Sequence, residues 1–133
     1  MPYIVANLNE VEKITDKNDK LSSIDEFKAH GIWVGESREC VAVVKYFAKA
    51  PHTSLWKRGA RVKGNTSIKP GTAIATFNNN GKYHGHAAIY ISQTATAINV
   101  YDQWNSVPLH FRSIQFKGHG YVSNDGDQFY VIE

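Results

Sequence analysis

The only cysteine of the chain lies where a helix is expected to begin. Residues 41–48 after Cys40 are apolar on nearly every side, as in a buried helix, and Pro51 would stop that helix. The acidic and hydroxyl residues within 36–39 suit a first turn, where unpaired backbone N–H groups attract oxygen ligands and negative charge. The same dipole lowers the pKa of a thiol, so Cys40 is placed as a thiolate nucleophile. A small apolar residue filling the core is the alternative.

A histidine and an aspartate are expected to meet across a β-hairpin. The patterns over 84–92 and 96–102 predict two strands joined by a turn near Thr94, and antiparallel pairing then sets His86 opposite Asp102. Opposed residues share a face with Cβ atoms about 5 Å apart, so the carboxylate could orient the ring and leave its other nitrogen for a thiol. A strand histidine and a hairpin-end carboxylate without catalytic roles are the alternative. Further residues on this face are expected to pack against the cysteine helix, namely Ala88, Tyr90, Ile98 and Val100.

The remaining segments predict an α+β fold with helices before an antiparallel sheet. Residues 1–34 are expected to form a loop-rich lead, in which the capping box Ser23–Glu26 starts a short helix that ends at Gly31. A long loop anchored by Trp56 and Val62 follows the cysteine helix. The other strands are expected over residues 72–77, 111–116 and 128–132.

Composition narrows the class of protein. With 133 residues and 42% apolar residues, the chain suits one domain, residues 1–133, with one core, and we expect a monomer. One cysteine rules out an intramolecular disulfide, as is usual for proteins of a reducing cytoplasm. The net charge of +3 is not gathered into a basic block, so no nucleic-acid partner is expected. We also expect synthesis in the cytoplasm without a signal peptide and no membrane insertion.

His84 raises a metal alternative. It shares a face with His86, and His-x-His on a strand, joined by Cys40 or Asp102, could provide three zinc ligands for a hydrolase. No second cysteine or glutamate base motif supports this site, so no metal or cofactor is expected and His84 is placed at the lip of a groove. Three aromatic residues are expected to line the groove with it, with core packing as their alternative: Trp56, Tyr83 and Trp104.

The order of these features resembles a known class of enzyme. A helix-start cysteine, a strand histidine and a polar residue on the adjoining strand are similar, over residues 35–133, to papain-like amidases of the NlpC and CHAP type. Five short motifs carry a closer resemblance: ECVAVVK at 39–45, GTAIATF at 71–77, GHAAIY at 85–90, DQW at 102–104 and SNDGDQF at 123–129. Together they resemble the second family of type VI secretion amidase effectors, bacterial toxins that cut the peptidoglycan of other bacteria. Some animals have acquired the same family as an antibacterial defence.

The resemblance implies a cysteine peptidase or amidase with a papain-like fold. Cys40 would be the nucleophile, His86 the base and then the acid, and Asp102 the orienting group. Backbone N–H groups at the helix start, those of Cys40 and Val41, would hold the oxyanion. Two features depart from the family pattern: Arg38 stands where a small residue is expected, and the first 34 residues are longer and more charged than expected.

The resemblance also implies a substrate, a partner and a place of action. The substrate would be the peptide stem of peptidoglycan, with the crosslink from D-alanine to meso-diaminopimelate as the favoured bond. A type VI system would inject the toxin into the periplasm of the target cell, and its producer would need an immunity protein. A module of the same fold that binds a cell-wall peptide or a partner without cutting it is the alternative from another class.

Overall fold

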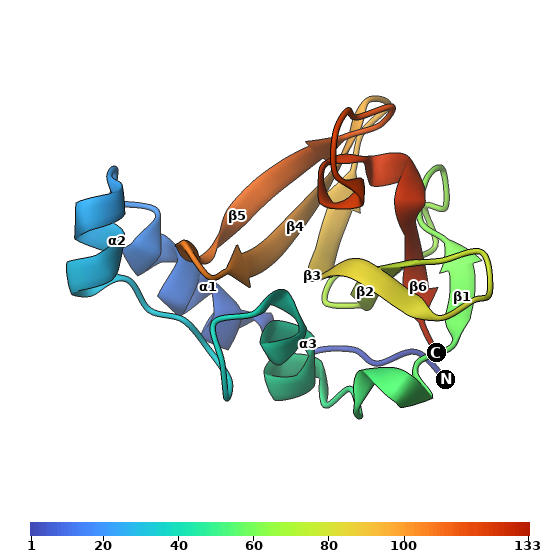
Figure 1. Cartoon of the computed structure of the whole chain (residues 1–133), viewed down its shortest axis with the longest axis horizontal. Helices are drawn as coiled ribbons and strands as arrows, with labels where there is room; N and C mark the ends of the chain where they lie inside the picture. Colours follow the sequence, from blue (N-terminus) through green and yellow to red (C-terminus); the bar gives the residue numbers. More distant parts are fainter.

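A computed structural model describes all residues, 1–133, as three helices on one antiparallel sheet (Figure 1). The helices are α1 (Leu8–Asn18), α2 (Ile24–His30) and α3 (Cys40–Ala48). The strands are β1 (Arg58–Arg61), β2 (Ala73–Phe77), β3 (Tyr83–Gln93), β4 (Ala97–Trp104), β5 (Val107–Gln115) and β6 (Phe129–Ile132). Three short 3₁₀ helices lie between them: η1 (Thr53–Leu55), η2 (Val122–Asn124) and η3 (Gly126–Gln128). The predicted α+β class is therefore confirmed.

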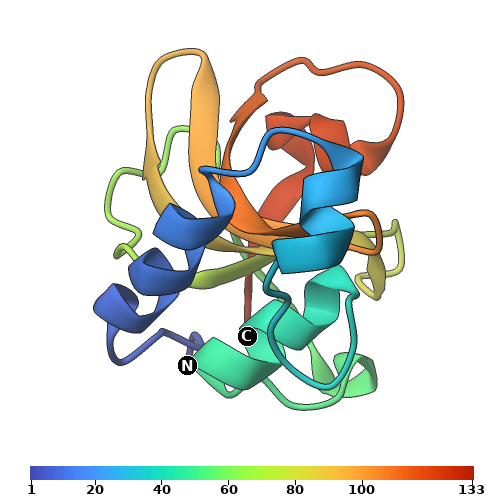
Figure 2. The same cartoon turned by 90° about the vertical axis from the view of Figure 1, so that its left-hand side faces the viewer.

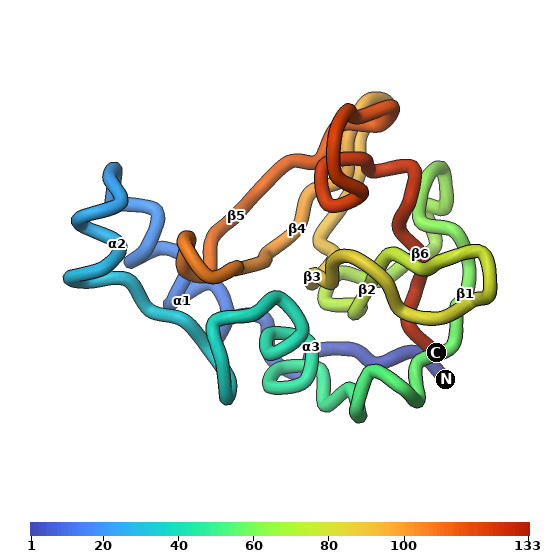
Figure 3. The backbone as a smooth tube through the Cα atoms, in the orientation of Figure 1, coloured from blue at the N-terminus to red at the C-terminus, as the bar shows by residue number.

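The sheet is continuous, with strand order β1-β6-β2-β3-β4-β5. Helix α3 packs against β3, while α1 and α2 lie toward β5 (Figures 1 and 2). The backbone trace brings both chain ends together beside β1, where the Met1 ammonium lies 4.0 Å from the Glu133 carboxylate (Figure 3). None of the helices has the length and apolar character needed to cross a bilayer.

Each face of the sheet has its own apolar core, and this corrects one prediction. Ala87 and Ile89 point to the face covered by α3, where they join Val43 and Val44 of that helix. The residues expected to meet α3 point to the other face, where they pack with Val62 and with residues of β2, β5 and β6. Those misassigned residues are Ala88, Tyr90, Ile98 and Val100. Alternation along a strand separates 87 from 88, and hydrophobicity alone does not say which face a helix covers.

The N-terminal segment is more helical than predicted. Helix α1 replaces the loop expected there: Asn7 caps it by accepting a hydrogen bond from the Asn9 N–H, and Val11 and Thr15 are buried. Charged residues outnumber this narrow buried stripe, which hid its helical spacing. The predicted helix after Ser23 is confirmed as α2, with Ser23 as its N-cap and the chain leaving the helix at Gly31.

Two further boundaries differ from those expected. Helix α3 begins at Cys40 itself, so residues 35–39 form bends before the helix rather than its first turn. The loop after α3 contains β1, a short polar strand that pairs with β6 at the edge of the sheet. An exposed edge strand needs little apolar patterning, so its sequence resembles a loop.

The β3–β4 hairpin forms, but in a register shifted by two residues from the predicted one. Ile89 pairs with Tyr101 and Tyr90 with Val100, and a bulge follows before Ser92 pairs with Asn99. Continuing this register places Asp102 beside residue 88, diagonal to His86. On the His86 side of the bulge, a shift by two leaves His86 and Asp102 on a shared face, so the expected meeting of the two residues survives.

Candidate active site

His86 and Asp102 form a buried pair. The imidazole Nε2 lies 2.7 Å from the Asp102 Oδ2, and Asp102 has no exposed surface. Because Nε2 is engaged by the carboxylate, Nδ1 is the ring nitrogen left for a reacting group. The predicted contact between these side chains is therefore present, across a diagonal rather than a directly opposed pair.

Arg112 of β5 completes the charge balance around Asp102 and was not predicted. Its Nη2 lies 2.7 Å and its Nε 3.1 Å from the Asp102 Oδ2. Burial raises the pKa of the Asp102 carboxyl, but the hydrogen bond from His86 and the charge of Arg112 bring that pKa below its ordinary value. Asp102 is therefore a carboxylate over the whole neutral range. Continuing the antiparallel pairing from β4 to β5 would have placed Arg112 opposite Val100, on the same face of the sheet as Asp102.

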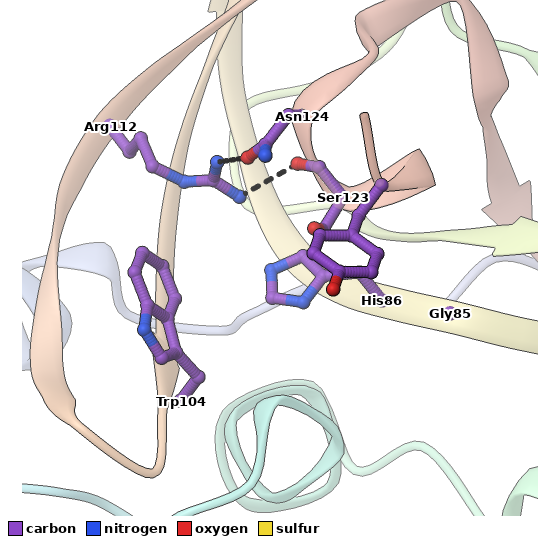
Figure 4. Close-up of a pocket in the computed structure, with 7 residues that line it drawn as sticks. Gly85, His86, Trp104, Arg112, Ser123 and Asn124 are labelled. Atoms are coloured by element: carbon purple, nitrogen blue, oxygen red, sulfur yellow. Dashed lines mark hydrogen bonds between the residues drawn. The ribbon is translucent and has the colours of Figure 1, made fainter. Parts of the chain in front are cut away.

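Arg112 also connects the site to residues 121–124, which we call the C-terminal segment. Its guanidinium donates to the carbonyl oxygen of Ser123 at 3.0 Å and to the Asn124 Oδ1 at 3.2 Å (Figure 4). His86, Trp104 and Arg112 face this segment across a pocket that also includes Gly85 (Figure 4). The groove thus extends past the imidazole, away from the cysteine.

Cys40 lies in a neighbouring pocket that shares His86 and Trp104 with the first. Its sulfur is 3.5 Å from the Tyr83 hydroxyl oxygen. Burial raises the pKa of the Cys40 thiol, but the hydrogen bond and charge of His86, with the Tyr83 hydroxyl, bring that pKa below its ordinary value. Burial lowers the pKa of His86, yet its hydrogen bonds to Asp102 and Cys40 raise it to about 9. Both shifts favour the charged forms of the pair, a thiolate on Cys40 and an imidazolium on His86.

The start of α3 leaves backbone donors beside the sulfur. Cys40 and Val41 are the first helical residues, so their N–H groups have no partner within the helix. The N-cap residue Glu39 makes no side-chain cap hydrogen bond. Val41 lines the same pocket as Cys40 and His86. This arrangement offers two N–H groups to an oxygen that develops charge next to the thiol.

The residues predicted to line a groove do not all lie at the same pocket. Tyr83 and Trp104 line the Cys40 pocket, whereas His84 lines an adjoining one with residues of 120–123. Trp56 is only 3% exposed and belongs to the core, so its assignment to the groove is wrong. Its ring meets Tyr83 edge to face at 4.9 Å between centroids, and it supports the pocket from beneath. Large aromatic side chains occur both in cores and in grooves, so the sequence alone did not distinguish the two locations.

Arg38, the departure from the family pattern, is accommodated outside the pocket. Its guanidinium carbon lies 4.0 Å from the centroid of a Trp33 ring, in a cation–π contact. Arg38 is not among the residues that line the Cys40 pocket. A large residue is therefore tolerated two positions before the thiol.

The zinc alternative lacks a converging set of ligands. His84 is exposed and lines a different pocket from Cys40, although it is only two residues from His86. No group of three His, Cys, Asp or Glu side chains is placed to hold a metal ion. The donors at this site form a chain of hydrogen bonds instead.

A bulge at Gly85 aims His86 toward the site. Gly85 has φ +110°, in the left-handed region, and the β2–β3 register shifts there. The Thr76 hydroxyl fills the break in the ladder by donating to the His84 carbonyl and accepting from the His86 N–H at 2.9 Å. His86 is thereby held at a defined orientation by backbone as well as by Asp102.

Replacing Gly85 with alanine should misplace His86. A Cβ there would lie 2.4 Å from the Val122 Cγ2 and 2.5 Å from the Thr76 Oγ1, so the strand or the C-terminal segment must move. We expect a loss of about 2 kcal/mol in the free energy of unfolding, from strain and crowding, measured by urea denaturation. The rate of the amide hydrolysis expected from the sequence resemblance should fall on the order of 10²-fold, because displacements near 1 Å carry that cost.

Gly81 offers a matched control for that substitution. Its φ is +76°, yet nothing lies within 4 Å of a Cβ built there. Gly81→Ala should therefore lose about 1 kcal/mol through backbone strain and keep the wild-type rate. Equal losses of rate in both variants would contradict the role given to the Gly85 bulge.

A helix that starts at a cysteine and packs on an antiparallel sheet, with a histidine that lines the cysteine pocket and is paired with a buried aspartate, defines an α+β protein of the papain-like type. The chain belongs to the domesticated amidase effector 2 family, whose model matches residues 13–132. The resemblance to type VI secretion amidase effectors, inferred from five motifs, is thereby confirmed.

Known proteins show the same relationship. Domesticated amidase effector 2 of Ixodes scapularis is 43% identical over 122 residues, which cover 86% of each chain. Type VI secretion amidase effector 2 protein of Salmonella typhi is 29% identical over 151 residues, and the alignment covers both chains in full. A solved structure of type 6 secretion amidase effector 2 superposes with a TM-score of 0.62 at 28% identity, covering 81% of this chain and 91% of that one.

Proposed function

We propose that this protein is an amidase that hydrolyses the peptide stems of peptidoglycan through a covalent thioester on Cys40. The observation that supports this proposal most directly is the Cys40–His86–Asp102 cluster at a pocket, in a chain of an amidase effector family. The crosslink from D-alanine to meso-diaminopimelate is the bond we favour. The bacterial relative, named as a type VI secretion effector, supports delivery by such a system and an immunity protein as partner.

The mechanism follows from the protonation states of the pair. The Cys40 thiolate attacks the carbonyl carbon, and the resulting oxyanion accepts hydrogen bonds from the N–H groups of Cys40 and Val41. The His86 imidazolium then gives its proton to the leaving nitrogen, so the C–N bond breaks and an acyl thioester remains. Neutral His86 takes one proton from water as the water oxygen attacks the thioester, and the C–S bond then breaks to release the carboxylic acid and the Cys40 thiolate, which restores the thiolate–imidazolium pair. Asp102 keeps the ring oriented through both steps.

Digestion of purified sacculi tests this function. Mass spectrometry of the released fragments should show new free amino and carboxyl ends at one peptide bond of the stem, and their masses identify that bond. Alkylated protein is the control, since iodoacetamide has only one cysteine to modify. Protein that is retained on sacculi without releasing fragments would show a binding module instead.

The rate should follow a bell-shaped dependence on pH. Since the active form pairs a thiolate with an imidazolium, kcat/KM should rise as Cys40 loses its proton, at a pH below the ordinary thiol pKa. It should fall again as His86 loses its proton, near its raised pKa of about 9. Alkylation by iodoacetamide needs only the thiolate, so its rate should stay high where hydrolysis falls. Parallel decline of the two rates at high pH would contradict the role of His86 as the acid.

A further inference from the structure

Gln103, the residue after Asp102, forms hydrogen bonds with the segment that leads to Cys40. Gln103 is fully buried, and its side chain points to the opposite face of β4 from Asp102. Its Oε1 accepts from the Val34 N–H at 2.8 Å, and its Nε2 donates to the Val34 carbonyl at 2.9 Å. The same Nε2 also lies 3.2 Å from the carbonyl oxygens of Ser37 and Glu39. One carboxamide thus spans the whole approach to Cys40.

Apart from Gln103, that approach is held mainly by local contacts: the Glu36–Lys45 ion pair, the stacking of Arg38 on Trp33 and the Glu39 N–H donating to the Ser37 hydroxyl. Residues 35–39 are bends without regular hydrogen bonding, and Gly35 has φ +86°. Glu39, the last residue before Cys40, does not cap the helix through its side chain. The neighbouring strand residue adds one anchor further back, where the Trp33 indole N–H donates to the Trp104 carbonyl at 2.8 Å. Gln103 is therefore the long-range contact to the Glu39 carbonyl directly before the nucleophile, which otherwise accepts only from the Ala42 N–H at 3.2 Å in the first turn of α3.

We propose that Gln103 is a positioning residue that sets the place of Cys40 and of the first N–H groups of α3 relative to His86. Adjacent residues of one strand then hold both halves of the site: Asp102 orients the imidazole, and Gln103 holds the loop that carries the sulfur. This inference rests on the proposed function, since it concerns the same thiol. Loss of these hydrogen bonds should let the sulfur move away from the imidazole and from the backbone N–H groups at the start of α3. Displacements near 1 Å cost on the order of 10²-fold in rate.

Asn18 provides a matched control in the same chain. Its amide forms the same pair of hydrogen bonds with the backbone of Ile32 that Gln103 forms with Val34. The Oδ1 accepts from the Ile32 N–H at 2.9 Å and the Nδ2 donates to the Ile32 carbonyl at 2.8 Å. Asn18 is 2% exposed. Removing this amide should destabilise the fold to a similar degree, yet it leaves the contacts at Ser37 and Glu39 in place.

The test measures the rate of Cys40 alkylation by iodoacetamide as a function of pH, in full-length protein. In Gln103→Met, which keeps the volume and deletes the amide, the thiolate pKa should rise by about one unit, and the alkylation rate near pH 7 should fall about tenfold. The kcat/KM for sacculus fragments should fall on the order of 10²-fold. Asn18→Leu should lose stability in urea while keeping the wild-type alkylation profile. Gln103→Leu, which also deletes the amide without adding a charge, should shift the profile as Gln103→Met does and serves if the latter does not fold.

The outcomes separate this inference from the proposed function. A wild-type thiol that titrates at its ordinary pKa would overturn the nucleophile assignment itself. A lowered pKa in the wild type that is unchanged in the folded Gln103 variant would overturn the positioning role alone. An equal shift in Asn18→Leu would also overturn it, because general destabilisation would then explain the effect.

Discussion

Cys40→Ala should abolish amide hydrolysis and leave the protein folded. In the proposed mechanism the thiol is the covalent nucleophile, and removal of a nucleophile costs on the order of 10⁵-fold in rate or more, since no other group takes its place. The residue is small and only partly buried, so the free energy of unfolding should change by less than about 1 kcal/mol. Fragment release from sacculi and urea denaturation provide the two measurements.

Chemical modification gives this prediction an independent check. Since the chain has one cysteine, wild-type protein blocked with iodoacetamide should match Cys40→Ala in rate. Protection of the rate by prior incubation with soluble peptide stems would place the thiol at the substrate site. Hydrolysis that persists in the alanine variant would refute the thioester mechanism, and it would direct attention to a water-activating site.

Asp102→Asn should lower the rate of hydrolysis by about 10³- to 10⁴-fold while retaining measurable activity. The amide can still contact the His86 Nε2, but it neither stabilises the imidazolium nor selects the ring orientation that presents Nδ1 to Cys40. The pKa of His86 should therefore fall from about 9, because the carboxylate is a main cause of its elevation. The descending side of the pH–rate profile should move to lower pH with it.

The same substitution should cost stability, because it leaves the Arg112 charge without its partner in a buried setting. Breaking a buried ion pair from one side costs on the order of 3 kcal/mol, so rates are best compared well below the midpoint of thermal unfolding. Asp127→Asn is the control: Asp127 pairs with Lys63 at 3.2 Å, away from the pocket, and its loss should leave the rate unchanged. A full wild-type rate in Asp102→Asn would remove the orienting role.

Arg112 and Gln103 show that the site is held by more than the three proposed reacting groups. Arg112 keeps Asp102 ionised and connects it to the C-terminal segment that borders the groove. Gln103 connects the same strand to the loop before the nucleophile. The acid and the nucleophile are thus supported from opposite faces of β4, which ties their geometry to one structural element.

Local signals in the chain were sufficient for the position of Cys40 and for the meeting of His86 with Asp102. Helix-start chemistry depends on neighbours within a few residues, so the place of the thiol at the first residue of α3 was predictable. The period of two along strands decided that His86 and Asp102 share a face, and this held although the predicted register was wrong by two residues.

The tertiary structure alone decided what surrounds those groups. Which face α3 covers, the burial of Trp56 and the partners of Asp102 and Gln103 depend on contacts between segments far apart in the chain. A polar side chain such as Gln103 is compatible with an exposed strand until folding buries it and supplies its hydrogen-bond partners. The sequence by itself therefore determined which groups we propose as reacting groups, because the place of each rests on local geometry, whereas the packing of distant segments determined how they are held.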